Sequence, residues 1–194
     1  MNSKNVLIIA GEASGDLHGA SLIRELKKID GSLKIFGVGG NKMLAEGMEL
    51  IYHIDKMAFL GFVEVVKHLP FIKKVQRDLI DEVKKRNVKE VILIDYPGFN
   101  LSIAKKLKSL DLKLIYYITP QVWAWGKSRV KKIKELFNKV LVVFPFEEKF
   151  FKSKNVNAEF VGHPLIQEIN SYDYLNRDQL NNKFELDPAK EILL

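Results

Sequence analysis

The fold is decided near the amino terminus by the stretch VLIIAGEASGD, residues Val6–Asp16. Five consecutive apolar residues, Val6–Ala10, predict a strand that is buried on both faces. The glycines that follow allow the backbone to turn tightly, and apolar residues at helical spacing come next. The stretch therefore predicts a strand, a tight turn and a helix, which together open a parallel α/β sheet.

The same alternation of strand and helix continues along the chain. Further apolar runs predict strands at Leu33–Val38, Val91–Ile94, Leu114–Ile118 and Val140–Phe144, with helical patterns between them. Strands that are apolar throughout and separated by helices are typical of a sheet covered on both faces. We therefore expect a Rossmann-like, doubly wound parallel sheet.

Toward the carboxyl terminus the composition changes. Residues Ser171–Pro188 are polar, with one weak helical pattern at Arg177–Phe184, and EILL at Glu191–Leu194 predicts the start of another strand. Because an isolated apolar strand cannot bury itself, we expect a linker that leads to a further domain. The expected division is a Rossmann-like domain over residues 1–168, followed over 169–194 by the linker and the first strand of the second domain.

Composition excludes several classes of protein. The 194 residues contain no cysteine, which rules out disulfides, thiolate metal sites and a cysteine nucleophile. The formal net charge of +7 suits either a solvated lysine-rich surface or an anionic partner. Lysine dominates without an arginine cluster or an aromatic–basic platform, so we expect no nucleic-acid partner. No apolar run reaches the roughly 20 residues of a transmembrane helix, so a soluble or peripheral protein is expected.

The first of three polar segments at predicted strand ends is GEASGD, Gly11–Asp16. Ligands of open parallel sheets bind at the carboxyl ends of strands. Neither the dinucleotide fingerprint nor the P-loop pattern fits, and the carboxylates of Glu12 and Asp16 favour hydroxyl groups over phosphate. The alternative is a structural turn in which Ser14 caps the helix.

The second segment is DYPGFN, Asp95–Asn100, directly after a predicted strand. A carboxylate at a strand tip can accept a hydroxyl proton as a general base. The alternative is that Asp95 caps backbone N–H groups in a Pro-Gly turn, while Asn100 caps the following helix.

The third segment, Thr119–Gly126, holds both tryptophans of the chain. They are a candidate flat wall for a sugar ring or an acyl chain, beside hydrogen bonds from Gln121. The alternative is that they cover the edge of the core.

A fourth segment runs from Met57 to Lys74 and joins apolar residues to lysines. This combination suits an element at a membrane surface, where basic groups meet anionic headgroups. The alternative is a core-packed pair of helices. The candidate membrane or acyl contacts are Phe62, Val63, Val66, Leu69, Phe71 and Ile72. The His163-Pro164 pair is expected to form a structural turn rather than a metal site.

With these motifs, the sequence resembles the bacterial lipid-A-disaccharide synthases. The resemblance covers the chain apart from the tail after Leu165, in the order and spacing of that family. The matching stretches are AGEASGDLHGASLIRELK (Ala10–Lys27), GVGGNKMLAEGME (Gly37–Glu49), LGFVEVVKHLP (Leu60–Pro70), IDYPGFN (Ile94–Asn100), TPQVWAWGKSRVKKIK (Thr119–Lys134), FPFEEKFF (Phe144–Phe151) and FVGHPL (Phe160–Leu165).

The resemblance implies the amino-terminal half of an inverting glycosyltransferase of the two-domain GT-B type. It implies UDP-2,3-diacylglucosamine as donor and 2,3-diacylglucosamine 1-phosphate as acceptor, giving a β-1,6-linked disaccharide 1-phosphate and UDP. It also implies that no metal or other cofactor is needed. The enzyme is expected to sit peripherally, at an anionic surface on the cytoplasmic side of the inner membrane. Assembly as a homodimer stays open.

Residue by residue, the resemblance assigns Asp95 as the catalytic residue, a general base toward the acceptor 6-hydroxyl. Gln121 departs from the serine often found in its loop, and Gly98 replaces an acidic residue of some members. The substrate-binding candidates are Glu12, Ser14, Gly15, Asp16, Asn100, Gln121 and Trp123. In the family the nucleotide site lies mainly in the carboxyl-terminal domain, so these residues alone are expected to be inactive.

Two other hypotheses remain open at this point. One is a different transferase or an epimerase that uses a UDP-sugar on the same fold, because a fold does not fix its chemistry. The other is a module that binds an anionic glycolipid without catalysis. A dinucleotide oxidoreductase is the least favoured, since its glycine fingerprint is missing.

Overall fold

A computed structural model describes residues 4–57, 68–122, 127–187 and 190. The chain divides into two compact units, Met1–Gly162 and His163–Leu194. The first unit contains the sheet and all three polar segments at strand ends. Its boundary falls inside the 1–168 segment that the sequence assigns to the Rossmann-like domain.

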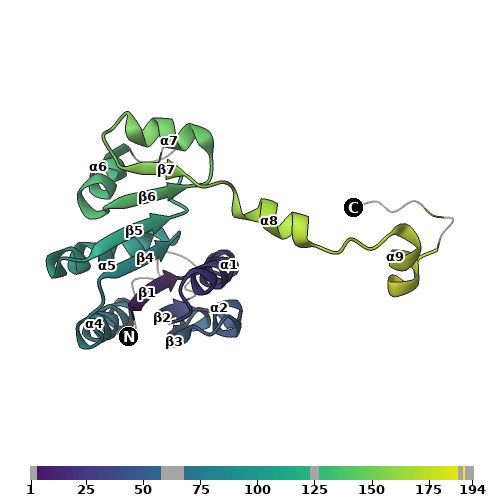
Figure 1. Cartoon of the computed structure of the whole chain (residues 1–194), viewed down its shortest axis with the longest axis horizontal. Coiled ribbons are helices and arrows are strands. Elements are labelled where there is room, and N and C mark those ends of the chain that lie inside the picture. Colours follow the sequence, from purple (N-terminus) through teal and green to yellow (C-terminus); the bar gives the residue numbers. More distant parts are fainter. Residues whose placement is uncertain (1–3, 58–67, 123–126, 188–189, 191–194) are drawn as a thin grey trace. The chain divides into compact units, whose positions relative to one another are not determined.

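Seven strands of the first unit form one sheet in the order β3-β2-β1-β4-β5-β6-β7, which Figure 1 shows from bottom to top. Every neighbouring pair is parallel. The prediction of a doubly wound, Rossmann-like sheet is therefore confirmed. The chain begins in the middle at β1, builds outward to β3, and then returns to β4 on the other side of β1. The strands are β1 (Asn5–Ala10), β2 (Lys34–Gly39), β3 (Glu49–His53), β4 (Glu90–Ile94), β5 (Lys113–Tyr117), β6 (Lys139–Val142) and β7 (Ala158–Phe160).

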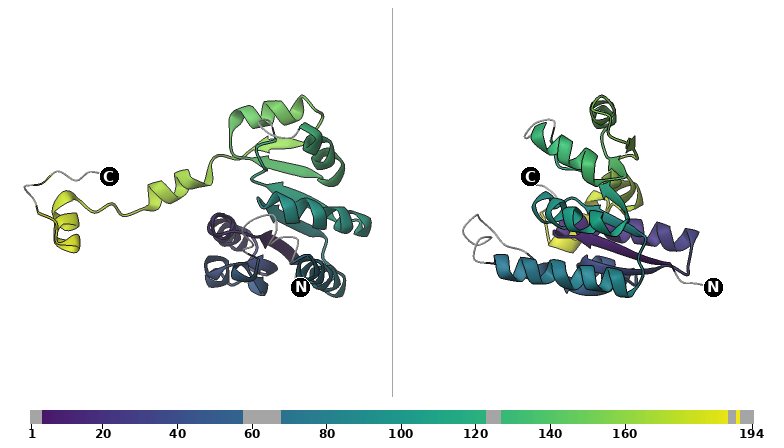
Figure 2. Two further views of the ribbon diagram at one scale, coloured as in Figure 1. Left: turned by 180° about the vertical axis from the view of Figure 1, so that it is seen from behind. Right: turned by 90° about the vertical axis from the view of Figure 1, so that its left-hand side faces the viewer.

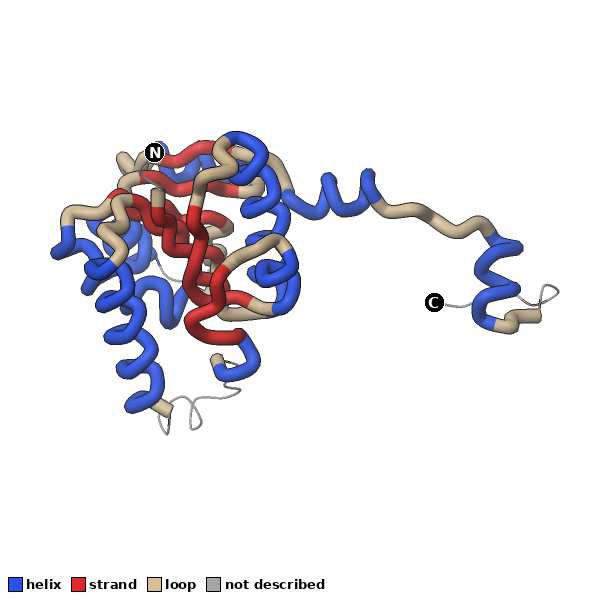
Figure 3. The backbone as a smooth tube through the Cα atoms, turned by 60° about the horizontal axis from the view of Figure 1, so that its bottom comes forward, coloured by secondary structure: helices blue, strands red, loops and turns tan. Residues whose placement is uncertain are grey.

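Helices cover both faces of the sheet, as the two further views in Figure 2 and the tube in Figure 3 show. Side chains of α4, α5 and α6 join one buried cluster, whereas those of α1 and α2 join another. Strand β1 separates the two, because Leu7 and Ile9 point to the first cluster and Ile8 to the second. The helices are α1 (Ala13–Ile29), α2 (Asn41–Ala45), α4 (Leu69–Lys85), α5 (Pro97–Leu107), α6 (Lys127–Leu136) and α7 (Pro145–Lys152), with short 3-10 turns at Ile54–Lys56 and Lys108–Leu110.

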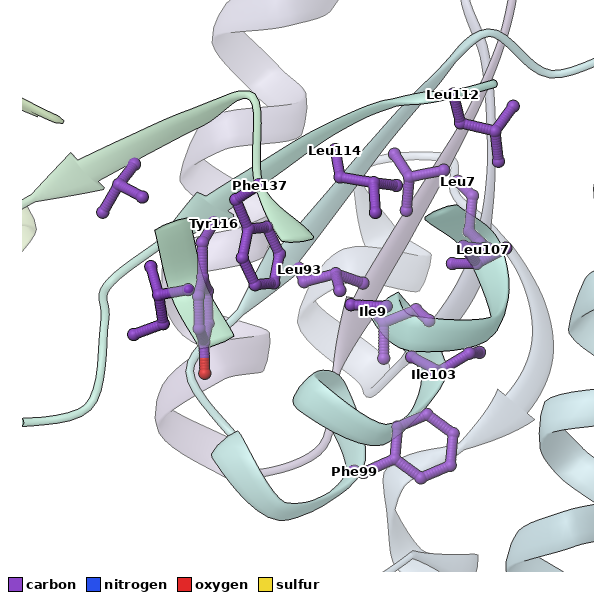
Figure 4. Packing of buried hydrophobic residues seen from close by; sticks show 14 of the residues in the cluster. Leu7, Ile9, Leu93, Phe99, Ile103, Leu107, Leu112, Leu114, Tyr116 and Phe137 are labelled. Atoms are coloured by element: carbon purple, nitrogen blue, oxygen red, sulfur yellow. The ribbon is translucent and has the colours of Figure 1, made fainter. Parts of the chain in front are cut away.

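The larger cluster extends beneath the carboxyl ends of β4 and β5 (Figure 4). The ring of Tyr116 stacks on Phe137 with centroids 4.6 Å apart. Burial of each large apolar side chain contributes about 1.5–3 kcal/mol, so this layer holds the strand ends firmly. The loops that follow β4 and β5 therefore start from fixed positions.

The second unit contains α8 (Pro164–Ser171) and α9 (Arg177–Phe184). The helix predicted at Arg177–Phe184 is confirmed, and it begins with a capping box. The Asn176 side chain accepts from the Gln179 backbone N–H at 2.9 Å, and the Gln179 side chain accepts from the Asn176 N–H at 2.8 Å. The strand predicted at Glu191–Leu194 lies outside the described residues.

Among the described helices, none has both the length and the apolar content that crossing a bilayer requires.

Candidate active site

The candidate site lies where the strand order reverses, between β1 and β4. The two strands pair in register up to Ala10 opposite Ile94, so the residues that follow them emerge side by side. Glu12 follows β1 and Asp95 follows β4. Glu12 is exposed as a whole, but partial burial of its carboxyl raises the pKa of that group, and the nearby charge of Asp95 raises it further. The sequence thus brings two of its candidate residues together at the topological switch point, where ligands of open α/β sheets bind.

The backbone at the ends of β4 and β5 adopts unusual conformations. Asp95 and Tyr96 have φ values of 45° and 44°, and Ile118 has a φ of 59°. This left-handed region is uncommon for residues other than glycine, and for a β-branched residue it is a genuine outlier. Such strain costs roughly 1–3 kcal/mol per residue and clusters at functional sites.

A network of hydrogen bonds holds the strained turn in place. The backbone carbonyl of Asp95 accepts from the Asn100 amide at 2.7 Å and from the Tyr116 hydroxyl at 3.1 Å. The Asn100 amide also donates to the carbonyl of Ile94 at 3.0 Å. The Asp95 N–H donates to the carbonyl of Tyr117 at 3.0 Å. The backbone of Asp95 is therefore fixed from both β5 and α5.

The side chain of Asp95 is partly buried, and burial raises its pKa. A hydrogen bond from the Tyr96 N–H and the charge of His18 act in the opposite direction. The net result is a carboxylate that is a stronger base than an ordinary aspartate while still reaching solvent. A perturbed carboxylate at a switch point is a physical marker of a functional site.

His18 is a site residue that the sequence reasoning missed. It lies on α1, four residues after Ser14 and hence on the same face of the helix. The four-residue spacing from Ser14 is the feature of the sequence that could have indicated His18 as a neighbour of the site. The placement of His18 makes α1 a third contributor to the surroundings of Asp95.

The ring of Tyr96 occupies the space that a side chain at Gly11, the first residue after β1, would need. A Cβ atom at Gly11 would lie 2.2 Å from Cδ1 of Tyr96, so only glycine leaves room for this ring. The Tyr96 hydroxyl donates to the carbonyl of Met57 at 3.1 Å. Burial, and then the charge of Glu12, raise the pKa of Tyr96. The loops after β1 and β4 are therefore packed against each other at the site.

Asp16 is placed differently from Glu12. Its carboxylate is 4% exposed and accepts backbone N–H groups of Gly40, Lys42 and Met43 at 2.7, 3.0 and 3.0 Å. Three such bonds satisfy the amino terminus of α2. Asp16 therefore caps α2, and its carboxylate is engaged by the backbone of that segment rather than directed at a ligand.

The other substrate-binding candidates are of three kinds: exposed, buried, or outside the described residues. Ser14 is exposed in the first turn of α1, whose N-cap is Glu12, and Gln121 is exposed after β5. Gly15 is buried against Ala10, and Asn100 is fully buried beneath Asp95. The helix after β4 begins at Pro97, so Asn100 supports the turn from inside α5 rather than capping the helix. Trp123 lies outside the described residues.

Half of the predicted membrane contacts lie outside the described residues, namely Phe62, Val63 and Val66. Leu69 begins α4 and is 43% exposed. Phe71 and Ile72 are partly buried against the core, and the Phe71 ring meets Tyr52 edge-on at 5.9 Å. Leu69 is thus the most exposed of the three described candidates.

Within the described part of the chain, no three His, Asp or Glu side chains gather as ligands for a metal ion.

Comparisons with a family model and with curated relatives point to the same family. The sequence model of the family described as lipid-A-disaccharide synthetase matches residues 6–194. A lipid-A-disaccharide synthase of Coxiella burnetii (strain Dugway 5J108-111) is 42% identical over 193 residues, covering 100% of this chain and 51% of the relative. A lipid-A-disaccharide synthase of Geobacter metallireducens is 42% identical over 191 residues, covering 98% and 49%. The chain spans about half the length of the curated relatives it matches.

Solved structures share the fold at low sequence identity. A UDP-GlcNAc 2-epimerase from Neisseria meningitidis bound to UDP-GlcNAc matches with a TM-score of 0.64 and 11% identity, over 94% of this chain and 54% of that one. A glycosyltransferase from Rickettsia africae matches with a TM-score of 0.54 and 15% identity, over 97% and 51%. At such identities the likeness establishes the fold alone.

Proposed function

The chain belongs to the lipid-A-disaccharide synthetase family, and from this premise we propose that it is the acceptor-binding half of an inverting glycosyltransferase of lipid A biosynthesis. The donor is UDP-2,3-diacylglucosamine and the acceptor is 2,3-diacylglucosamine 1-phosphate. The products are the β-1,6-linked disaccharide 1-phosphate and UDP.

The observation that carries this proposal is the placement of Asp95. Its carboxylate sits on a strained strand tip, partly buried, with a raised pKa, beside Glu12. A base of this kind accepts the proton of the acceptor 6-hydroxyl while the hydroxyl oxygen attacks the anomeric carbon of the donor. The bond from that carbon to UDP breaks, and its electron pair leaves with UDP. Attack and departure on opposite faces invert the anomeric configuration.

Glu12 has a supporting role in this scheme. It is exposed just after β1 and feels the charge of Asp95, which disfavours ionisation of the Glu12 carboxyl. A sugar with several hydroxyl groups can donate to both carboxylates at once. Such contacts hold the acceptor so that the 6-hydroxyl stays near Asp95, which supplies the orientation that the reaction needs.

The departing nucleotide is assigned to another part of the protein. The chain spans about half of its curated relatives, and a transferase needs groups that stabilise the leaving diphosphate. We assign these groups to the portion of such proteins that this chain does not match. Residues 1–194 alone are then inactive. Leu69, exposed at the start of α4 with the exposed Lys73 one turn later, supports contact with an anionic membrane surface.

The test joins residues 1–194 to the carboxyl-terminal half of the Coxiella burnetii relative and measures disaccharide formation. We expect transfer with diacylated substrates and little with UDP-GlcNAc, while residues 1–194 alone form no product. Equal turnover of UDP-GlcNAc would support a different UDP-sugar enzyme instead. Binding of glycolipid without turnover of any UDP-sugar would support a binding module.

A further inference from the structure

An opening lies between α5 and α6, beside the turn that carries Asp95. Its volume is about 480 Å³. The two helices are neighbours on the same face of the sheet (Figures 1 and 2). Pro97 and Gly98, in the first turn of α5, line one part of the opening. We call this feature the α5–α6 groove.

The α5–α6 groove is rich in positive charge. Lys105, Arg129 and Lys132 line it together with a single acid, Glu135, which leaves a lining charge of +2 from three cations and one anion. Among the described residues, none of these three cations has a carboxylate within 4.0 Å. Three cations against one acid in the same lining leave an excess of positive charge, which attracts an anion.

The lining is also partly apolar. Leu101 and Leu136 are half-buried in the wall, and both also pack against the core. A fully hydrated free anion gains nothing from such a wall, whereas an anion attached to an apolar group gains from both kinds of lining. The composition of the groove therefore selects an amphipathic anion.

The groove begins near the candidate base, which is not itself part of the lining. Pro97 and Gly98 come two and three residues after Asp95, so the opening starts at the same strand end. A Cβ atom at Gly98 would have no neighbour within 4 Å, which shows that this end is open. The charge of Arg129 is felt by Tyr116, whose hydroxyl binds the Asp95 carbonyl. Arg129 and Asp95 therefore both act on the Tyr116 side chain, which places the groove near the candidate base.

We propose that the α5–α6 groove binds the phosphate monoester of the acylated sugar phosphate that accepts the glycosyl group, with Lys105, Arg129 and Lys132 as its cationic contacts. The proposal rests on the proposed function, because it names where the acceptor phosphate binds while Asp95 faces the hydroxyl group. Phosphate in the groove and the sugar at Asp95 fix the acceptor at two points. Arg129 can meet phosphate oxygens in a bidentate manner, and the lysines add point charges.

The test compares two double variants that remove the same charge from the same helices. Lys105→Ala with Lys132→Ala removes two groove cations, whereas Lys106→Ala with Lys131→Ala removes their exposed sequence neighbours, which do not line the groove. The probe is hexyl phosphate, titrated into the 194-residue chain and followed by NMR. Hexanol is the uncharged match, and vesicles that contain phosphatidylglycerol report on general membrane attraction. Thermal unfolding checks that both variants fold.

We expect the groove variant to bind hexyl phosphate about tenfold more weakly than the control variant, which stays within about twofold of the original chain. We expect neither variant to change hexanol binding, and both to lose vesicle binding equally because their net charges match. Equal affinity of the two variants for hexyl phosphate would overturn the proposal. Loss of vesicle binding by the groove variant alone, with hexyl phosphate unaffected, would overturn it in favour of a lipid headgroup.

The same variants separate this proposal from the proposed function. In the fused protein, the groove variant should raise the KM for the acceptor and leave the KM for the donor unchanged. Transfer with the same acceptor KM in both variants would contradict the groove assignment alone. Absence of transfer in the unmutated fusion would contradict the proposed function alone, because the hexyl phosphate titration does not depend on turnover.

Discussion

The Tyr116 hydroxyl donates a hydrogen bond to the backbone carbonyl of Asp95 at 3.1 Å, which connects the buried core directly to the candidate base. The Tyr116 ring is fully buried and stacks on Phe137 (Figure 4). Its hydroxyl thus reaches the strained turn from a fixed position. The packing of β5 against Phe137, the residue after α6, thereby sets the position of the residue that follows β4.

Replacing Tyr116 with phenylalanine should loosen the Asp95 turn. The carbonyl of Asp95 keeps its bond from Asn100, so we expect a loss of about 1 kcal/mol in the free energy of unfolding. We expect kcat of the fused protein to fall by roughly threefold to tenfold, since the base is less well oriented. Tyr52→Phe, which removes a hydroxyl contact to Asp78, is the matched control and should leave kcat unchanged. Equal kcat in the two variants would argue against the positioning role of Tyr116.

Replacing Gly11 with alanine should disturb the site from the β1 side. The added Cβ would lie 2.2 Å from the Tyr96 ring, which must then move, at a cost of about 1–3 kcal/mol. Gly98→Ala is the control for stability, because its Cβ would meet nothing within 4 Å. Urea unfolding measures both. A Gly11→Ala chain as stable as the original would show that the ring is not fixed over the glycine.

Replacing Asp16 with alanine should weaken the fold rather than a substrate contact. The change leaves three backbone N–H groups at the start of α2 without their carboxylate, which should cost roughly 3 kcal/mol. Asp55→Ala, at a side chain that is 84% exposed, should cost less than about 0.5 kcal/mol. Urea unfolding gives both values. A stable Asp16→Ala chain whose fused form binds acceptor poorly would return Asp16 to the substrate site.

Ionisation of Asp95 should raise the rate of the reaction and lower the stability of the fold as pH rises. The titratable groups near Asp95 are Glu12, His18, Tyr96 and Tyr116. Burial is the largest cause of the raised pKa of Asp95. A protonated carboxyl cannot accept the hydroxyl proton, so kcat/KM should fall with decreasing pH around a pKa above the ordinary aspartate value. Since the folded pKa is raised, ionisation of Asp95 costs stability as pH rises from that ordinary value through the folded pKa.

Asp95→Asn removes this cost, so Tm at neutral pH should rise by about 1–3 °C relative to the original chain. The difference in Tm should vanish at a pH below the ordinary aspartate pKa, where the original chain is also neutral. Calorimetry at the two pH values measures this. A lower Tm for Asp95→Asn at neutral pH would show that the ionised carboxylate stabilises the fold.

The central strands of the sheet could be predicted from sequence, and the edges could not. Continuous apolar runs mark the five strands from β2 to β6 in the sheet order, because each is covered on both faces. The two strands that the runs did not reveal, β3 and β7, are the two edges of the sheet. Most side chains of β3 are half-buried and two of the three in β7 are exposed, so ELIYH and AEF lack the continuous apolar pattern.

The sequence predicts the site residues whose position depends only on which strand they follow. It does not predict the roles of residues that depend on contacts between separate elements. Asp95 and Glu12 come directly after buried strands, so the topology alone brings them together. Asp16 looks equally suitable in sequence, yet three backbone N–H groups from a neighbouring segment engage it. His18 and the α5–α6 groove combine residues from separate helices, which no local pattern reveals.

The role of Asp95 as general base is tested by the turnover number of the Asp95→Asn form of the fused protein with both diacylated substrates. If Asp95 is the general base, kcat should fall by about 10²–10⁴-fold, while KM for each substrate stays within about threefold. A kcat within about threefold of the unmutated fusion would contradict the assignment of Asp95 as the base.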